Sequence, residues 1–133
     1  MTFRETLDRH LQAIRDRNLD AFRETVAPSG LIVVMANGRL VRDTAEFLGL
    51  HRDWFTDTAW TVEFEPVSIR EWSDVGVAVF RLIYRERPQG KPPIHETSYL
   101  TLVFARREDG WEMVHDQNTP EKKQQAKEVA SSQ

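Results

Sequence analysis

Polar side chains recur at alternate positions near the C-terminal end of the sequence, in segments otherwise rich in aliphatic and aromatic residues. Tyr99 and Thr101 are two positions apart, and so are His115 and Gln117. Residues two apart on a β-strand point to the same side of a sheet, so each pair shares a face. A phenol, a hydroxyl, an imidazole and an amide could hold a ligand through hydrogen bonds. The imidazole could also transfer a proton near neutral pH.

His115 is the candidate catalytic residue, and Arg81 is a candidate ligand contact. His115 could act as a general base, or it could be a hydrogen-bonded residue of a pocket wall. Arg81 lies among aliphatic residues, an unusual place for a guanidinium. It could bind a ligand carboxylate, or it could pair with a glutamate such as Glu63, Glu65 or Glu96.

Two tryptophans lie where a predicted helix leads into the first long strand. Tryptophans in such a place form either part of the core or the edge of a ligand pocket. We include both in the expected pocket, which consists of Trp54, Trp60, Arg81, Tyr99, Thr101, His115 and Gln117.

Several kinds of chemistry are disfavoured by composition. There is no cysteine, and the four histidines show no metal-ligand spacing, so we predict no metal and no cofactor. The net charge is −3 and the basic residues are dispersed, which argues against nucleic-acid binding. No stretch approaches the roughly 20 apolar residues of a membrane span, and the charged start does not resemble a secretion signal. We therefore expect a soluble, cytoplasmic protein.

Helix-capping residues and a change of hydrophobic period predict an α+β fold. Thr2, Asn18 and Asp43 are typical N-cap residues, and Glu5 completes a capping box with Thr2, so three N-terminal helices are expected. Asn37-Gly38 predicts a small hairpin between the second and third helices. Alternating patterns then predict antiparallel strands over 60–72, 75–87, 94–107 and 111–118. We expect one domain over 1–120 and a solvated tail over 121–133.

The predicted turns pair Arg81 with Tyr99 and Thr101 with Gln117, which puts the polar candidates on one face. Thr101 and Gln117 could bind a ligand or satisfy each other across the strands. The opposite face is apolar, and three helices can cover only one face. A homodimer is therefore predicted to bury the other, through Phe80, Leu82, Leu102 and Phe104. A one-residue slip in register would exchange the faces and make Asp116 the leading general base.

The order of elements and the ending Trp111-Glu-Met-Val-His115-Asp-Gln117-Asn-Thr119 after the turn Glu108-Asp-Gly110 resemble the nuclear transport factor 2-like superfamily. The chain looks most like its SnoaL-like branch and its calcium/calmodulin-dependent protein kinase II association domain-like branch. The resemblance implies a cone-shaped, curved antiparallel sheet of the cystatin-like type, with three helices on one face and a sheet-mediated dimer.

Three functions are compatible with that resemblance, because the superfamily contains enzymes, binders and oligomerisation modules. Ketosteroid isomerase belongs to it and needs an Asp base with Tyr and protonated carboxylic acid donors. The predicted hairpin 31–41 contains no carboxylate, so that set cannot be carried over. We favour a dimeric protein that binds a small molecule in an open pocket. The alternatives are a lyase or isomerase acting on a small carbonyl compound with His115 as base, and an oligomerisation module.

Overall fold

The three predicted helices are present in the computed structural model, which describes residues 1–122. They are α1 (Phe3–Arg15), α2 (Leu19–Glu24) and α3 (Thr44–Thr56), and they begin after Thr2, Asn18 and Asp43. The side chain of each cap accepts a hydrogen bond from a backbone N–H of the first turn. Glu5 completes the capping box by accepting from the Thr2 backbone at 2.9 Å. Sequence patterns therefore placed all three helix starts correctly.

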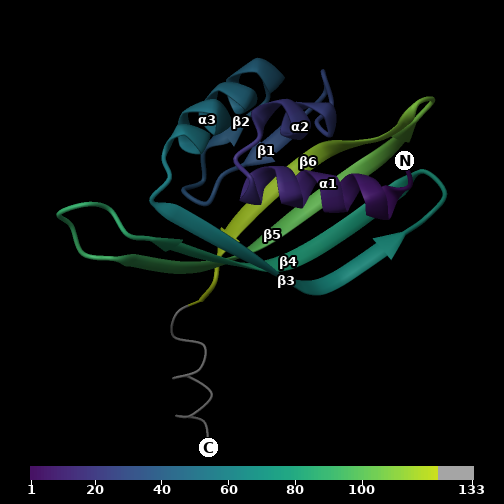
Figure 1. Ribbon diagram of the computed structural model, residues 1–133. Coiled ribbons are helices and arrows are strands. Elements are labelled where there is room, and N and C mark those ends of the chain that lie inside the picture. Colours follow the sequence, from purple (N-terminus) through teal and green to yellow (C-terminus); the bar gives the residue numbers. More distant parts are fainter. Residues whose placement is uncertain (123–133) are drawn as a thin grey trace, which may run out of the picture.

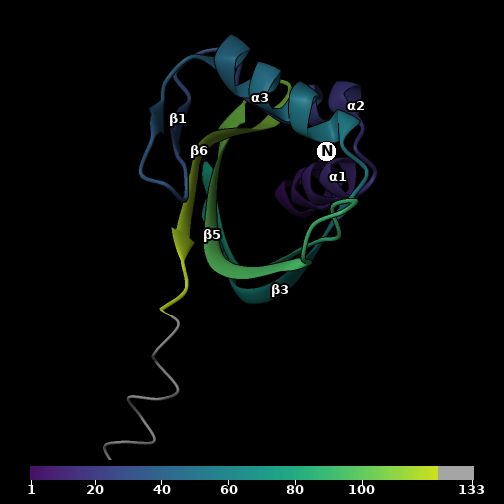
Figure 2. The same cartoon turned by 90° about the vertical axis from the view of Figure 1, so that its left-hand side faces the viewer.

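The four long strands also form where the alternating patterns predict them. They are β3 (Trp60–Glu71), β4 (Val75–Glu86), β5 (Ile94–Arg107) and β6 (Gly110–Pro120), each antiparallel to the next. Together with two short strands they make one curved, unclosed sheet in the order β2-β1-β6-β5-β4-β3. The helices lie on the concave side of this sheet, with α1 enclosed by the curve and α3 across its rim (Figure 1, Figure 2). The α+β, cystatin-like fold class is confirmed.

A small hairpin extends the sheet beyond β6. Its strands are β1 (Ile32–Val34) and β2 (Leu40–Val41), and Gly38 adopts a φ of +87° in the turn between them. Strand β1 runs parallel to β6, with Val33 opposite Asp116. The sequence pattern predicted the hairpin but gave no sign of this parallel pairing, which joins segments some 80 positions apart in the chain. The hairpin thereby forms a wall beside the concave face (Figure 2).

The strand register agrees with the prediction around the residues that were expected to form the pocket. Arg81 lies opposite Tyr99, and Thr101 lies opposite Gln117. The register shifts by one residue between Val103 and Phe104, because β6 carries a bulge. A bulge reverses the inward and outward alternation of the residues beyond it. Met113 therefore faces the core, on the side opposite to His115, although the two residues are two positions apart.

The predicted dimer interface is wrong, because the side chains assigned to it already lie beneath the helices of the same chain. Phe80 is 2% exposed, and Leu102 and Phe104 are 0% exposed. Leu82 packs against the same core cluster. These large side chains bury more apolar area than the smaller valines on the other face, so the helices cover them. The two faces of the sheet were thus exchanged in the sequence-based assignment.

Helix α1 approaches the sheet closely at one position. A Cβ atom added to Gly76 of β4 would lie 2.4 Å from the Phe3 ring, so only glycine leaves room for it. The Phe3 ring also packs edge-on against Phe104, with ring centroids 5.7 Å apart. This contact fixes the N-terminal end of α1 on β4 and β5. Within residues 1–122, no helix is long and apolar enough to cross a bilayer.

Candidate functional site

A cavity of about 270 Å³ lies between the concave face of the sheet, helix α3 and the β1–β2 hairpin. Its walls are almost entirely apolar, and several of them are aromatic. Its polar lining comes from His51 of α3 and from Asp116 and Asn118 of β6. The apolar lining includes Ile14, Val33, Met35, Phe47, Leu50, Trp54, Val62, Phe64, Leu82 and Leu100. A concave apolar site with a few convergent polar groups is typical of small-molecule binding.

Asp116 is the carboxyl group of this cavity. It lies on β6 between Leu102 of β5 and Val33 of β1, so both neighbouring strands place aliphatic residues beside it. No hydrogen bond or ion pair of its side chain occurs within residues 1–122. Burial without a partner disfavours the charged form and raises the pKa of Asp116 to about 7. The group can therefore donate or accept a proton at neutral pH, as a general acid or base must.

Asn118 stands two residues further along the same face of β6. Its Oδ1 is buried and has no hydrogen-bond partner among the described residues. A buried acceptor left without a donor costs about 1–3 kcal/mol, and a bound ligand could supply that donor. A second hollow, of about 520 Å³, adjoins the cavity and shares four lining residues with it: Ala36, Trp54, Leu82 and Asn118. This hollow forms the mouth, where Tyr84 and Glu96 add polar groups.

His51 faces the cavity from α3 and is held in one tautomer. Its Nδ1 lies 3.0 Å from the carbonyl oxygen of Phe47, which can only accept, so Nδ1 carries the proton. Burial, opposed by this hydrogen bond, lowers the pKa of His51 to about 4, so the ring is neutral at pH 7. The ring stacks on Phe22 with centroids 4.4 Å apart. His51 was not among the residues predicted from sequence.

Trp54 lines the cavity, whereas Trp60 lies behind it. The two rings stack with centroids 3.9 Å apart, and Nε1 of Trp60 donates to the Trp54 carbonyl at 2.9 Å. Trp60 is 1% exposed and does not reach the cavity. The guanidinium carbon of Arg17 also lies over the Trp60 ring, 4.2 Å from its centroid. The stack holds Trp54 in place as a rigid edge of the site.

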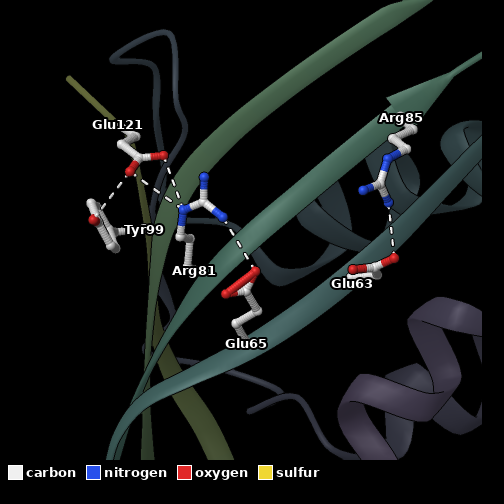
Figure 3. A network of polar contacts seen from close by, with 6 residues as sticks. All are labelled: Glu63, Glu65, Arg81, Arg85, Tyr99 and Glu121. Atoms are coloured by element: carbon white, nitrogen blue, oxygen red, sulfur yellow. Dashed lines mark hydrogen bonds and ion pairs between the residues drawn. The ribbon is translucent and has the colours of Figure 1, made fainter. Parts of the chain in front are cut away.

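Arg81 and Tyr99 lie on the opposite, convex face of the sheet, where they form an ion-pair network (Figure 3). Arg81 donates to Glu121 at 3.1 Å and to Glu65 at 3.2 Å. The Tyr99 hydroxyl donates to Glu121 at 3.4 Å. Among the alternatives considered for Arg81, pairing with Glu65 is therefore the one observed. Glu121, expected to begin the tail, is bound to the sheet, and the remainder of that predicted tail, 123–133, lies outside the described residues.

Thr101, His115 and Gln117 also lie on the convex face, and none of them lines the cavity. Nε2 of His115 is 3.2 Å from Oε1 of Gln117 on its own strand. The expected pocket thus has the two faces exchanged, and of its residues only Trp54 lines the cavity. The face of the sheet that the helices cover, and that lines the cavity, can be recognised by the large size of its apolar side chains. Polar residues on the convex face remain in contact with water or with each other, so they need no ligand.

Helix α3 contributes four cavity residues, Phe47, Leu50, His51 and Trp54, because of their spacing. His51 and Phe47 are four residues apart and therefore lie on one side of the helix. The sequence contains this signal, since Phe47, Leu50, His51 and Trp54 follow helical periodicity. No cluster of three or more metal-ligating side chains occurs within residues 1–122.

Solved structures of similar fold define the class of protein. A candidate calcium/calmodulin-dependent protein kinase type II association domain from Thiobacillus denitrificans is 18% identical, with 91% of this chain and 96% of that chain covered and a TM-score of 0.76. A protein with a cystatin-like fold from Caulobacter vibrioides is 20% identical, with 98% and 95% covered and a TM-score of 0.74. A candidate dehydratase of the nuclear transport factor 2-like family from Streptomyces avermitilis is 13% identical, with 88% and 92% covered and a TM-score of 0.73. This class is the nuclear transport factor 2-like fold.

Residues 4–118 match the SnoaL-like domain, so the chain belongs to the SnoaL-like family. The match covers the three helices and nearly all of the sheet, including Asp116 and Asn118. The resemblance seen in the sequence is thereby confirmed. No curated protein matches the sequence significantly.

Proposed function

We propose that this protein binds a small, largely apolar molecule in the inner cavity, with Asp116 as its main polar contact. The observation that carries this proposal is the lone carboxyl group in an apolar cavity, without a hydrogen-bond or ionic partner in the described chain. Leaving such a group unpaired is unfavourable for folding alone. Strongly perturbed carboxyl groups in cavities are common at functional sites.

A bulky side chain introduced at the mouth of the cavity tests this proposal. Ala36 is exposed, yet it borders both the cavity and the mouth, so Ala36→Trp should block entry without disturbing the core. Ala45→Trp is the matched control, because Ala45 is exposed on α3 and borders neither space. We expect the neutral fluorescent probe N-phenyl-1-naphthylamine to bind the unmodified protein and Ala45→Trp, and to bind Ala36→Trp at least tenfold more weakly. Equal binding by all three proteins, or no binding by any, would overturn the proposal.

A second candidate function, proton transfer on a small carbonyl compound, is favoured by the pKa of about 7 for Asp116. The ionised carboxylate would remove a proton from the carbon next to a carbonyl, leaving an enolate and a neutral Asp116. In this form of the lyase or isomerase alternative, Asp116 takes the place of His115 as the base. A dehydratase is the enzyme class named for one protein of similar fold.

Hydrogen–deuterium exchange of 2-tetralone, followed by NMR in D₂O, tests this second function. We expect the protein to accelerate exchange, with a rate that rises as the pH passes through about 7, because only the ionised carboxylate accepts a proton. Asp116→Asn should abolish the acceleration, and His115→Phe should leave it unchanged. Loss of the acceleration in His115→Phe alone would restore His115 as the base.

We also propose that two copies associate through the convex face of the sheet. Half-buried Val77, Val79 and Val103 lie there, on neighbouring strands β4 and β5. A protein of similar fold is described as an association domain. Sedimentation velocity at micromolar concentration should give a dimer, and Val103→Glu should give a folded monomer. A monomeric unmodified protein would rule out this arrangement.

A further inference from the structure

Two polar atoms of the cavity that the fold leaves without partners are hydrogen-bond acceptors. Oδ1 of Asn118 is buried and unpaired within residues 1–122. His51 has its proton on Nδ1, where Phe47 accepts it, so Nε2 presents a lone pair. Nε2 of His51 has no hydrogen-bond partner in the described chain. His51 borders the cavity, whereas Nε2 of His10 is buried in the core. Because these two acceptors border one cavity, a ligand that carries a hydrogen-bond donor would satisfy them better than one that does not.

Charge and shape restrict the ligand further. The lining contains no lysine or arginine, so a ligand carboxylate would find no counter-charge and would face Asp116. The walls include the rings of Phe47, Trp54 and Phe64, which favour a flat ring system. Asp116 is neutral for part of the time at pH 7, which suits an uncharged ligand better than a cation.

We propose that His51 is a ligand-contacting residue and that, with Asn118, it makes the cavity selective for a neutral ring compound bearing a hydroxyl group. This inference rests on the proposed function, since it names the class of molecule that the same cavity binds. The hydroxyl donates to Nε2 of His51 or to Oδ1 of Asn118, and the ring lies against Trp54. The role of Asp116 as the titrating group is unchanged.

Four naphthalene probes of similar size separate the possibilities by isothermal titration calorimetry at pH 7. They are 2-naphthol, 2-methoxynaphthalene, 2-naphthoate and 2-naphthylmethylammonium. We expect 2-naphthol to bind about tenfold more tightly than 2-methoxynaphthalene, which keeps the oxygen but lacks the donor. We expect the naphthoate to bind most weakly. Equal affinity for the naphthol and its methyl ether, or tightest binding of either charged probe, would overturn the inference.

Two variants assign the preference to its residues. His51→Phe keeps a flat ring to stack on Phe22 but removes the acceptor, and Asn118→Leu removes the amide at similar size. At least one of the two should bring the ratio of naphthol to methyl ether affinities close to one, while exposed His95→Phe keeps it near ten. The ratio is measured within one protein, so partial unfolding of a variant cancels.

An unchanged ratio in both His51→Phe and Asn118→Leu would remove these residues from the site. The proposed function fails separately, because it requires only that some neutral probe bind and be excluded by Ala36→Trp. Binding of 2-methoxynaphthalene as tightly as 2-naphthol would therefore leave the cavity a binding site while rejecting its selectivity for hydroxyl groups.

Discussion

The two faces of the sheet treat carboxyl groups in opposite ways. Glu121 contacts Arg81 and Tyr99 of the convex face (Figure 3). A hydrogen bond with Thr97 and these two contacts hold the pKa of Glu121 below the ordinary value despite some burial. On the concave face, Asp116 has no such partner, and burial raises its pKa to about 7. The paired carboxylate is explained by the fold itself. The unpaired one is not, and it therefore marks the face on which a ligand belongs.

Neighbouring residues of β5 provide the largest test of this difference, because alternate side chains point to opposite faces. Leu102 is fully buried under the helices, and Thr101 lies on the convex face. Leu102→Ala should lower the free energy of unfolding by about 2–5 kcal/mol, since it leaves a cavity in the core. Thr101→Ala should change it by less than about 1 kcal/mol. Urea unfolding measures both, and a reversed order would mean that the faces are assigned incorrectly here.

Asp116→Asn should stabilise the protein at high pH. The pKa of Asp116 is about 7 in the folded state and about 3.9 when unfolded. The folded state therefore binds more protons between these values, so the free energy of unfolding falls as the pH rises from 4 to 7. The resulting decrease in the free energy of unfolding is at most about 4 kcal/mol. The Asp116→Asn variant avoids this decrease, because an amide does not ionise. The variant should be more stable than the unmodified protein at pH 8 and indistinguishable from it near pH 4.

Other titrating groups do not obscure this comparison. The other titratable group lining the cavity is His51, and its pKa of about 4, like that of about 3 for His10, reduces stability only as the pH falls below about 6.5. That loss is common to both proteins. An equal or lower stability of Asp116→Asn at pH 8 would show that Asp116 has a stabilising partner in solution.

The fold was largely predictable because its signals are local. Caps at Thr2, Asn18 and Asp43 mark the helix starts, and the alternating pattern after Trp60 sets the long strands. Hairpin turns fixed the pairing of Arg81 with Tyr99 correctly. The parallel pairing of Val33 with Asp116 has no local signal, because it depends on how distant segments dock.

The site was less predictable, because it depends on which face of the sheet the helices cover. Alternation shows that Thr101 and Leu102 point in opposite directions, but it does not say which direction is inward. The bulge in β6 adds a second reversal, which puts Met113 and Asp116 on the same side despite their numbers. The bulky Phe80 and Phe104 indicated that the helices cover their face of the sheet. The polar side chains of the other face suggested a pocket there instead, so the two faces were exchanged in the prediction.

The smallest expected effect concerns the convex face. Arg81 joins Glu121 and Glu65, and its side chain is 34% exposed, so water and salt screen both ion pairs. Arg81→Met keeps much of the aliphatic stem but removes the charge, and it should lower the melting temperature by less than about 5 °C. The difference should shrink further in 1 M NaCl, where the charges are screened over about 3 Å. Binding of N-phenyl-1-naphthylamine should be unchanged, because Arg81 itself borders neither the cavity nor its mouth, and only its partner Glu121 lines the mouth. A weakened affinity with an intact melting temperature would mean that the convex network acts on the cavity through Glu121 at the mouth, and that the two faces are not independent.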